Sequence, residues 1–192
     1  MTKLSKARNN RPTMLDHFID IDALGPRICI IGPSSSGKST LATLIGQKTN
    51  RKVVHLDQLA HEPNTDWRRR SNMEFIADHD TAIMGDSWII EGNYQICMPQ
   101  RFERATSVIW LDPSLFGCIC RYLIRCIKSE HNRVGKLQGS TKEFNWALIK
   151  HTWFKYPKNK IIYKKILEPF QDRLIKINSM HDLNQYIKHW GL

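Results

Sequence analysis

The feature that most constrains this chain is a glycine- and serine-rich stretch at residues 32–40, which reads GPSSSGKST. It fits the pattern G-x-x-x-x-G-K-[ST]. An apolar, β-branched run at 27–31 precedes it, and residues 41–48 follow it with leucine and isoleucine at helical spacing. A buried strand, a glycine loop and a helix in this order form a phosphate site, because backbone N–H groups converge at the helix N-terminus. The pattern therefore predicts a loop that binds a nucleoside triphosphate.

The residues of this loop differ in their expected roles. The Lys38 ammonium is expected to reach the β- and γ-phosphates, and the Ser39 hydroxyl is expected to bind Mg²⁺. Gly32 and Gly37 are expected where a Cβ would block the backbone conformation or a close approach. The residues predicted to bind ATP are Gly32, Ser34, Ser35, Ser36, Gly37, Lys38, Ser39 and Thr40.

Length and composition favour one globular domain. A chain of 192 residues that is 41% hydrophobic can bury one sizeable core. We expect a domain at 27–192 and a partly disordered N-terminal extension at 1–26, whose apolar residues after position 13 pack on the domain. Residues 1–11 are polar and basic and lack the apolar segment of a secretory signal, and no apolar run reaches the length of a membrane span.

The cysteines indicate a reducing compartment. The chain has five of them, an odd number, and Cys118 and Cys120 have no second ligand pair at zinc spacing. Reduced, packed thiols are typical of cytosolic proteins, so we expect a cytoplasmic location.

The net charge of +11 predicts anionic partners, whether nucleotides, phosphorylated metabolites or nucleic acid. The basic excess is heaviest after residue 120. The lysines between Lys155 and Lys165 are either a solvated helical face or a patch for nucleic acid or an acidic partner. The triplet Arg68-Arg69-Arg70 is either a solvated helix start or a site for an anionic substrate.

Five short apolar segments alternate with helical ones, which predicts a three-layer α/β fold of the P-loop NTPase class. The expected strands are 27–31, 52–57, 86–91, 107–112 and 173–178. The expected helices include 67–83, capped by Asp66, one that starts at Asp112-Pro113, and one that ends at 189, capped by Ser179.

Acidic residues end three of the expected strands. They are Asp57, Glu91 and Asp112. Ligands of such sheets bind at the carboxyl ends of the strands. The sequence therefore predicts one sheet edge that gathers magnesium, triphosphate and three carboxylates.

Beyond the phosphate loop, the chain resembles the P-loop kinase-like DNA topology modulation proteins, relatives of adenylate and shikimate kinases. The resemblance covers roughly residues 27–190. It rests on the phosphate loop, His55-Leu56-Asp57-Gln58-Leu59, Pro63 with Trp67, Trp88-Ile89-Ile90-Glu91-Gly92-Asn93-Tyr94 and Leu111-Asp112, in that order. It implies a parallel sheet of order 2-3-1-4-5, a nucleoside/shikimate-kinase type of fold, and a lid around 129–143.

The sequence departs from adenylate kinases after the third expected strand. Those enzymes carry Asp-Gly-Phe-Pro-Arg there, whereas this chain carries Glu91-Gly92-Asn93-Tyr94-Gln95. Glu91 can still serve the metal, although its side chain is one methylene longer. Gln95 cannot form a charged fork to a phosphate, which argues against an AMP-type acceptor bound as in adenylate kinase.

The resemblance implies roles for residues outside the loop. Asp57 corresponds to the acid that acts as a base or orients the acceptor hydroxyl in shikimate-type kinases; the alternative is a capping aspartate. Arg121 and Arg125, four apart on one expected helix, are predicted to clamp the transferring phosphoryl group beside a lid arginine, Arg133. Their alternative is a solvated helix face or loop.

Two functions from different classes follow. The favoured one is a Mg²⁺- and ATP-dependent kinase that acts on a small-molecule acceptor, a nucleoside, nucleotide or hydroxyl metabolite. The alternative is a regulatory protein that binds or hydrolyses ATP and contacts nucleic acid, although no nucleic-acid-binding motif is present. A degenerate kinase kept as a nucleotide sensor is a third possibility, raised by Glu91 and Gln95.

Overall fold

The computed structural model describes residues 18–65, 67–128 and 146–192. The strands are β1 (Arg27–Ile31), β2 (Val53–His55), β3 (Trp88–Glu91), β4 (Ser107–Leu111) and β5 (Leu174–Ile177). The helices are α1 (Lys38–Thr49), α2 (Leu56–Ala60), α3 (Asn72–Ile83), α4 (Met98–Arg104), α5 (Leu115–Lys128), α6 (Trp146–Lys150), α7 (Tyr156–Leu167) and α8 (Met180–His189). The short 3₁₀ helices are η2 (Asp22–Leu24), η3 (Gln95–Cys97) and η5 (Glu168–Arg173), and η4 (His151–Lys155) is a π-helix.

The strands form one parallel sheet in the order β2-β3-β1-β4-β5, which confirms the predicted order. The central strands β1, β3 and β4 are buried almost throughout. This agrees with their continuous apolar sequences, since a parallel sheet covered on both faces excludes water from both sides of each strand.

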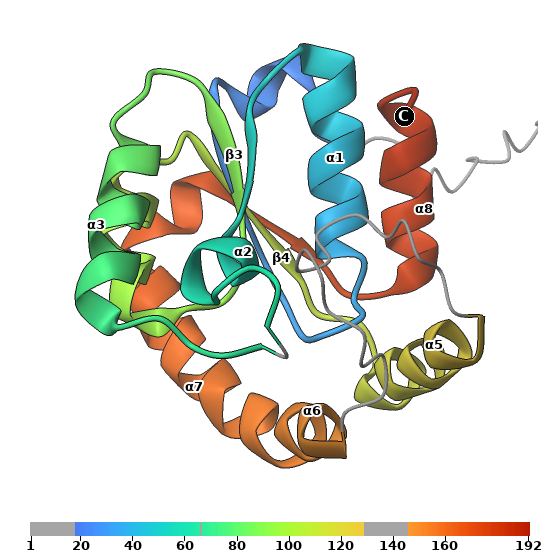
Figure 1. Ribbon diagram of the computed structural model, residues 1–192. Helices are drawn as coiled ribbons and strands as arrows, with labels where there is room; N and C mark the ends of the chain where they lie inside the picture. Colours follow the sequence, from blue (N-terminus) through green and yellow to red (C-terminus); the bar gives the residue numbers. More distant parts are fainter. Residues whose placement is uncertain (1–17, 66, 129–145) are drawn as a thin grey trace, which may run out of the picture.

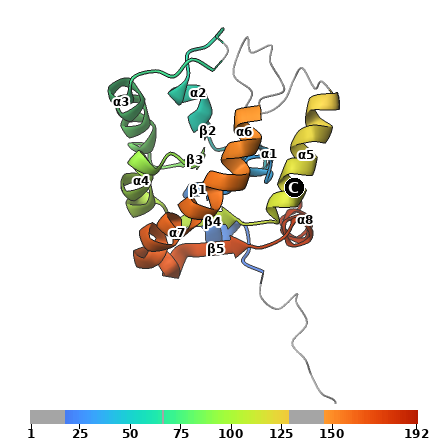
Figure 2. The same cartoon turned by 90° about the horizontal axis from the view of Figure 1, so that it is seen from below.

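Helices cover both faces of the sheet, so the molecule has three layers (Figures 1 and 2). On one face, side chains such as Cys29 and Ile31 of β1 pack in a core with α3, α4 and α7. On the other face, Ile28 and Ile30 pack with α1 and α8. The alternation along β1 follows from the two-residue side-chain period of a strand. Within the described ranges, no helix is both long and apolar enough to cross a bilayer.

Two helices begin later than the sequence predicts. α3 begins after Ser71, whose side chain accepts from the Glu74 amide in a reciprocal capping box; the expected cap, Asp66, lies outside the described residues. α5 begins at Leu115 because the Asp112 amide still donates to Ile177, which prolongs the β4–β5 ladder past the strand. The predicted Ser179 cap of α8 is confirmed, with the Asp182 amide as its donor.

Residues just before the domain lie against α8. The Phe18 ring meets the Tyr186 ring edge to face at 4.6 Å, and the Trp190 indole donates to the Ile19 carbonyl at 2.8 Å. The expected apolar residues Met14 and Leu15 lie outside the described part of the chain.

Candidate phosphate-binding site

The loop between β1 and α1 depends on two glycines. Gly32 has φ +150°, and a Cβ there would collide with the Leu111 carbonyl oxygen of β4. Gly37 has φ +96° at the N-cap of α1, where a Cβ would lie 3.2 Å from a Leu183 methyl group. Both positions are ones that L side chains rarely adopt. The loop therefore packs closely against the sheet and turns directly into the helix.

The polar groups of the loop face its own interior. The Lys38 ammonium donates to the Pro33 carbonyl at 2.9 Å, across the loop. The hydroxyl oxygens of Ser35 and Ser36 are buried and have no hydrogen-bond partner among the described residues. Buried polar atoms are normally paired, so unpaired donors beside a lysine fit a loop built to bind an anion.

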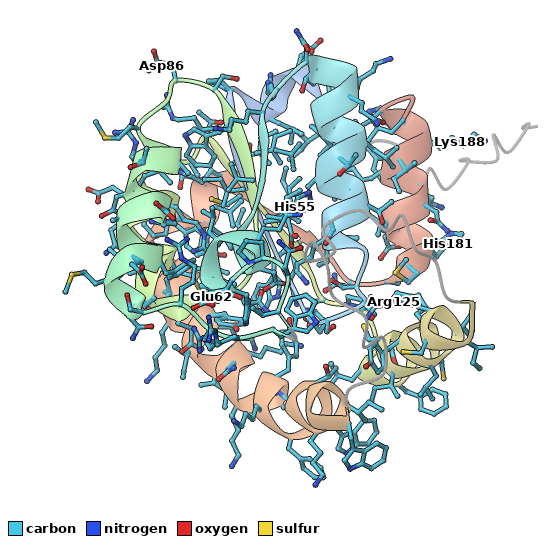
Figure 3. The ribbon with its side chains drawn as sticks, in the orientation of Figure 1. His55, Glu62, Asp86, Arg125, His181 and Lys188 are labelled. Atoms are coloured by element: carbon cyan, nitrogen blue, oxygen red, sulfur yellow. The ribbon has the colours of Figure 1, made fainter. Side chains whose placement is uncertain are left out.

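A carboxylate lies directly beneath the first turn of α1. The Ser39 hydroxyl donates to Glu91 Oε1 at 3.0 Å, and His55 Nδ1 lies 2.9 Å from the same oxygen. Burial raises the pKa of Glu91, but the hydrogen bonds from His55 and Ser39 and the Lys38 charge outweigh it, so the pKa lies below its usual value. Glu91 is therefore a buried carboxylate held in its ionised form. Figure 3 shows His55 in the middle of the molecule, far from Asp86, which lies in the turn between α3 and β3.

The residues present at this point fit a magnesium ion. Mg²⁺ prefers hard oxygen ligands and is usually held by one or two protein groups together with substrate phosphates. Ser39 and Glu91 supply a hydroxyl and a carboxylate 3.0 Å apart at the end of the phosphate loop. This is the pair that the sequence predicts for the metal.

The turn after β3 connects the phosphate loop to Asp57. The Asn93 side chain exchanges two hydrogen bonds with the Gly32 backbone, at 3.0 and 2.8 Å. The next residue, Tyr94, donates its hydroxyl to Asp57 Oδ1 at 2.7 Å. Arg101 lies fully buried behind the turn and donates to the carbonyls of Gly92 and Tyr94, at 2.7 and 3.3 Å. The consecutive residues Asn93 and Tyr94 therefore hold, respectively, the first glycine of the loop and the candidate base Asp57.

Asp57 lies in the second position of α2, not in the expected strand, because β2 ends at His55. It is still at the carboxyl end of β2, as the argument from parallel sheets requires. Its side chain is exposed, and its own carbonyl lies 2.9 Å from His61 Nδ1.

The two predicted clamp arginines differ in placement. Arg121 donates from Nε to the Ser35 carbonyl at 2.9 Å, so α5 contacts the phosphate loop. Arg125 lies one turn further along, with its guanidinium 5.0 Å from the Tyr122 ring centroid; Figure 3 labels it beside α5. Arg133 and the predicted lid at 129–143 lie outside the described residues.

Asp112, the third predicted carboxylate, is engaged elsewhere. It is nearly buried and forms ion pairs with Lys160 of α7 at 2.7 Å and Lys176 of β5 at 3.2 Å. These contacts tie β4, β5 and α7 together. Asp112 is therefore a structural group in this arrangement, and Lys160 is not part of a freely solvated basic face.

A cavity of about 740 Å³ lies at the opposite edge of the sheet. It is lined by residues at the amino ends of β1, β4 and β5, among them Arg27, Arg104 and Arg173. Each of these guanidiniums donates to a backbone carbonyl, of Arg104, Ile83 and Ala105 respectively. The arginines hold the start of the strands together, and the predicted phosphate loop lies at the other end of the sheet.

Comparison with known proteins supports the fold. No family model matches the sequence, and no curated protein matches it either. Among solved structures, a gluconokinase from Sinorhizobium meliloti 1021 superposes with a TM-score of 0.52 at 14% identity, over 87% of this chain and 90% of that one. A shikimate kinase from Bacteroides thetaiotaomicron superposes with a TM-score of 0.49 at 14% identity, over 85% of this chain and 94% of that one. The chain has the fold of a P-loop kinase.

The sequence did not point to three residues that organise the candidate site. They are His55, which contacts Glu91, Tyr94, which contacts Asp57, and Arg101, which supports the turn. The motifs quoted above contain His55 and Tyr94 but do not say what their side chains contact. Gln95, in contrast, has a buried side-chain amide nitrogen with no hydrogen-bond partner among the described residues, and its side chain lies near Tyr163 of α7.

Proposed function

We propose that the protein is a phosphotransferase that uses Mg²⁺ and ATP and moves the γ-phosphoryl group to a small-molecule acceptor. The observation that carries the proposal is the joined geometry at one sheet edge. The Ser39–Glu91 pair lies under the phosphate loop, and the turn 92–94 links that loop through Asn93 to Asp57. Donor and acceptor groups are thus held by one short segment.

On the donor side, the chain's own residues bind and neutralise the triphosphate. When ATP binds, the Lys38 ammonium would leave the Pro33 carbonyl and donate to phosphate oxygens instead. The backbone amides of the loop would donate to the same phosphates. Ser39 and Glu91 would hold Mg²⁺, which when bound supplies positive charge to the β- and γ-phosphate oxygens. Arg121, already at the Ser35 carbonyl, is placed to stabilise charge on the transferring group.

On the acceptor side, Asp57 would receive the proton of the acceptor hydroxyl. Tyr94 donates to Oδ1 and so orients the carboxylate, leaving Oδ2 for the substrate. As the acceptor oxygen bonds to the γ-phosphorus, the bond to the bridging oxygen of ADP breaks and the hydroxyl proton passes to Asp57. An acceptor that is itself a phosphate needs no such base, so dependence on Asp57 distinguishes the two acceptor types.

The test is a phosphoryl-transfer screen with Mg·ATP and pools of nucleosides, nucleotides, hydroxy acids and sugars, read by mass spectrometry. We expect a new phosphorylated species with the wild type and at least 100-fold less with Asp57→Asn. Hydrolysis of ATP with no acceptor modified in any pool would contradict the proposal. It would favour the regulatory alternative, in which case affinity for nucleic acid should fall steeply with salt.

A further inference from the structure

The segment that follows α2 folds back on itself as a short antiparallel bridge. The Glu62 amide donates to the Arg68 carbonyl at 2.9 Å and the Arg70 amide to the Ala60 carbonyl at 3.0 Å, so His61 and Arg69 are bridge partners. Successive side chains of an extended segment point to opposite faces. The three consecutive arginines are therefore divided, with Arg68 and Arg70 on one face and Arg69 on the other.

The two arginines on the first face are paired with acids. Arg68 donates from Nε to Glu62 Oε2 at 2.6 Å. Arg70 donates to Asp78 Oδ2 at 2.5 Å and to the Leu59 carbonyl at 3.0 Å. The first face is thus electrically balanced, and its contacts attach the segment to α2 and α3.

Arg69 has a different environment. Its guanidinium carbon lies 5.9 Å from the centroid of the Tyr94 ring, and among the described residues it has no acidic partner. The same ring carries the hydroxyl that donates to Asp57. A cation over the face of an aromatic ring is held in place without being neutralised. One tyrosine thus positions both an unneutralised positive charge and the candidate base.

We propose that Arg69 binds an anionic group of the acceptor, so that the substrate class is a hydroxylated molecule that also carries a carboxylate or a phosphate. This inference rests on the proposed phosphotransferase function. The guanidinium presents a planar fork that matches both anions, and stacking on Tyr94 reduces the freedom lost on binding. The anion would lie against the Arg69 guanidinium while the acceptor hydroxyl reaches Asp57, which favours small acceptors.

The experiment compares wild type with Arg69→Gln, Arg69→Lys and a matched control, Arg68→Gln, whose arginine lies next in sequence on the other face. Acceptors are hydroxy acids, sugar phosphates and neutral polyols, supplied as separate pools with Mg·ATP. We expect transfer only to an anionic pool, and which pool responds distinguishes a carboxylate from a phosphate. Arg69→Gln should raise the acceptor KM about 10- to 100-fold, with ATP KM unchanged and partial rescue by Arg69→Lys.

Transfer to neutral polyols as efficient as to the anionic pools would overturn the inference. So would an Arg69→Gln effect no larger than that of Arg68→Gln. If no pool is phosphorylated, the proposed function fails, but the inference is still decided by binding. The fluorescence of Trp67, whose ring contacts His61 in the same segment at 5.2 Å, is titrated with each pool. Saturable binding of an anionic pool that Arg69→Gln weakens tenfold or more supports the site, and no binding overturns it.

Discussion

The donor and acceptor sides of the site are built in different ways. The donor side is the loop 32–40 with its supports Glu91 and Arg121, and most of its polar contacts involve backbone groups of one continuous segment. The acceptor side is the segment 55–70 with Tyr94, and its contacts join side chains from separate elements. A backbone-made site is specified by glycine positions, whereas a side-chain site is specified by which distant residues meet.

If the proposed function holds, this difference predicts that the donor side takes one type of ligand whereas the acceptor side is open to variation. Backbone amides at a helix N-terminus recognise phosphate whatever side chains surround them. Changing a single arginine or tyrosine on the acceptor side, in contrast, changes the recognised chemistry.

The largest effect is expected from Lys38→Ala. Removal of its charge takes away a group that stabilises the transferring phosphoryl group, so kcat should fall about 10³-fold or more. Steady-state transfer or ATP turnover measures this. Lys48→Ala, an exposed lysine in the last turn of the same helix, is the control and should stay within twofold of wild type. An equal effect of the two changes would mean that Lys38 acts only through overall charge.

A smaller effect is expected from Tyr94→Phe on the acceptor side. The variant keeps the ring beneath Arg69 but removes the hydrogen bond to Asp57. A hydrogen bond to a charged group contributes about 1.5–3 kcal/mol, so kcat should fall about 10-fold or somewhat more, less than for Asp57→Asn. In a cycle of the two single variants and the double variant, the effects should not add, because Tyr94 acts through Asp57. Additive losses of kcat would show that Tyr94 does not act through Asp57.

The sequence predicted the sheet and named the residues of the candidate donor side, but only some of those on the candidate acceptor side. The strand positions follow from local apolar runs, whereas the strand order was an expectation from the family resemblance. The loop pattern names Lys38 and Ser39 directly. The division of the arginine triplet depends on a bridge between residues 61 and 69, which no local pattern encodes. The ion pairs of Asp112 likewise depend on β5 and α7, more than 45 residues away.

The donor loop should also contribute to stability through its backbone. Gly32→Ala places a Cβ against the Leu111 carbonyl at a φ of +150°, and we expect a loss of about 2–3 kcal/mol in the free energy of unfolding. Gly85→Ala is the control, since its Cβ would have no neighbour closer than 4.0 Å. Urea unfolding of both variants measures the difference. Equal free energies of unfolding for the two variants would show that the loop accommodates the added methyl group without loss of stability.

The smallest effect is a pH dependence of stability at α3, the helix to which Arg70 anchors the acceptor segment. His79 of this helix is fully buried, and although Nδ1 lies 3.0 Å from Asp80, burial lowers its pKa below the usual value near 6.5. Below that value the unfolded chain binds a proton that the folded chain rejects, so stability is lost as pH falls from about 7 toward 5. No such loss arises from this group above pH 7.

The measurement is urea unfolding at a series of pH values for wild type, His79→Gln and His181→Gln, whose histidine lies exposed on α8. The free energy of unfolding of wild type should fall by about 1 kcal/mol more than that of His79→Gln between pH 7 and pH 5. His181→Gln should follow wild type. Parallel curves for wild type and His79→Gln would mean that His79 accepts a proton inside the fold.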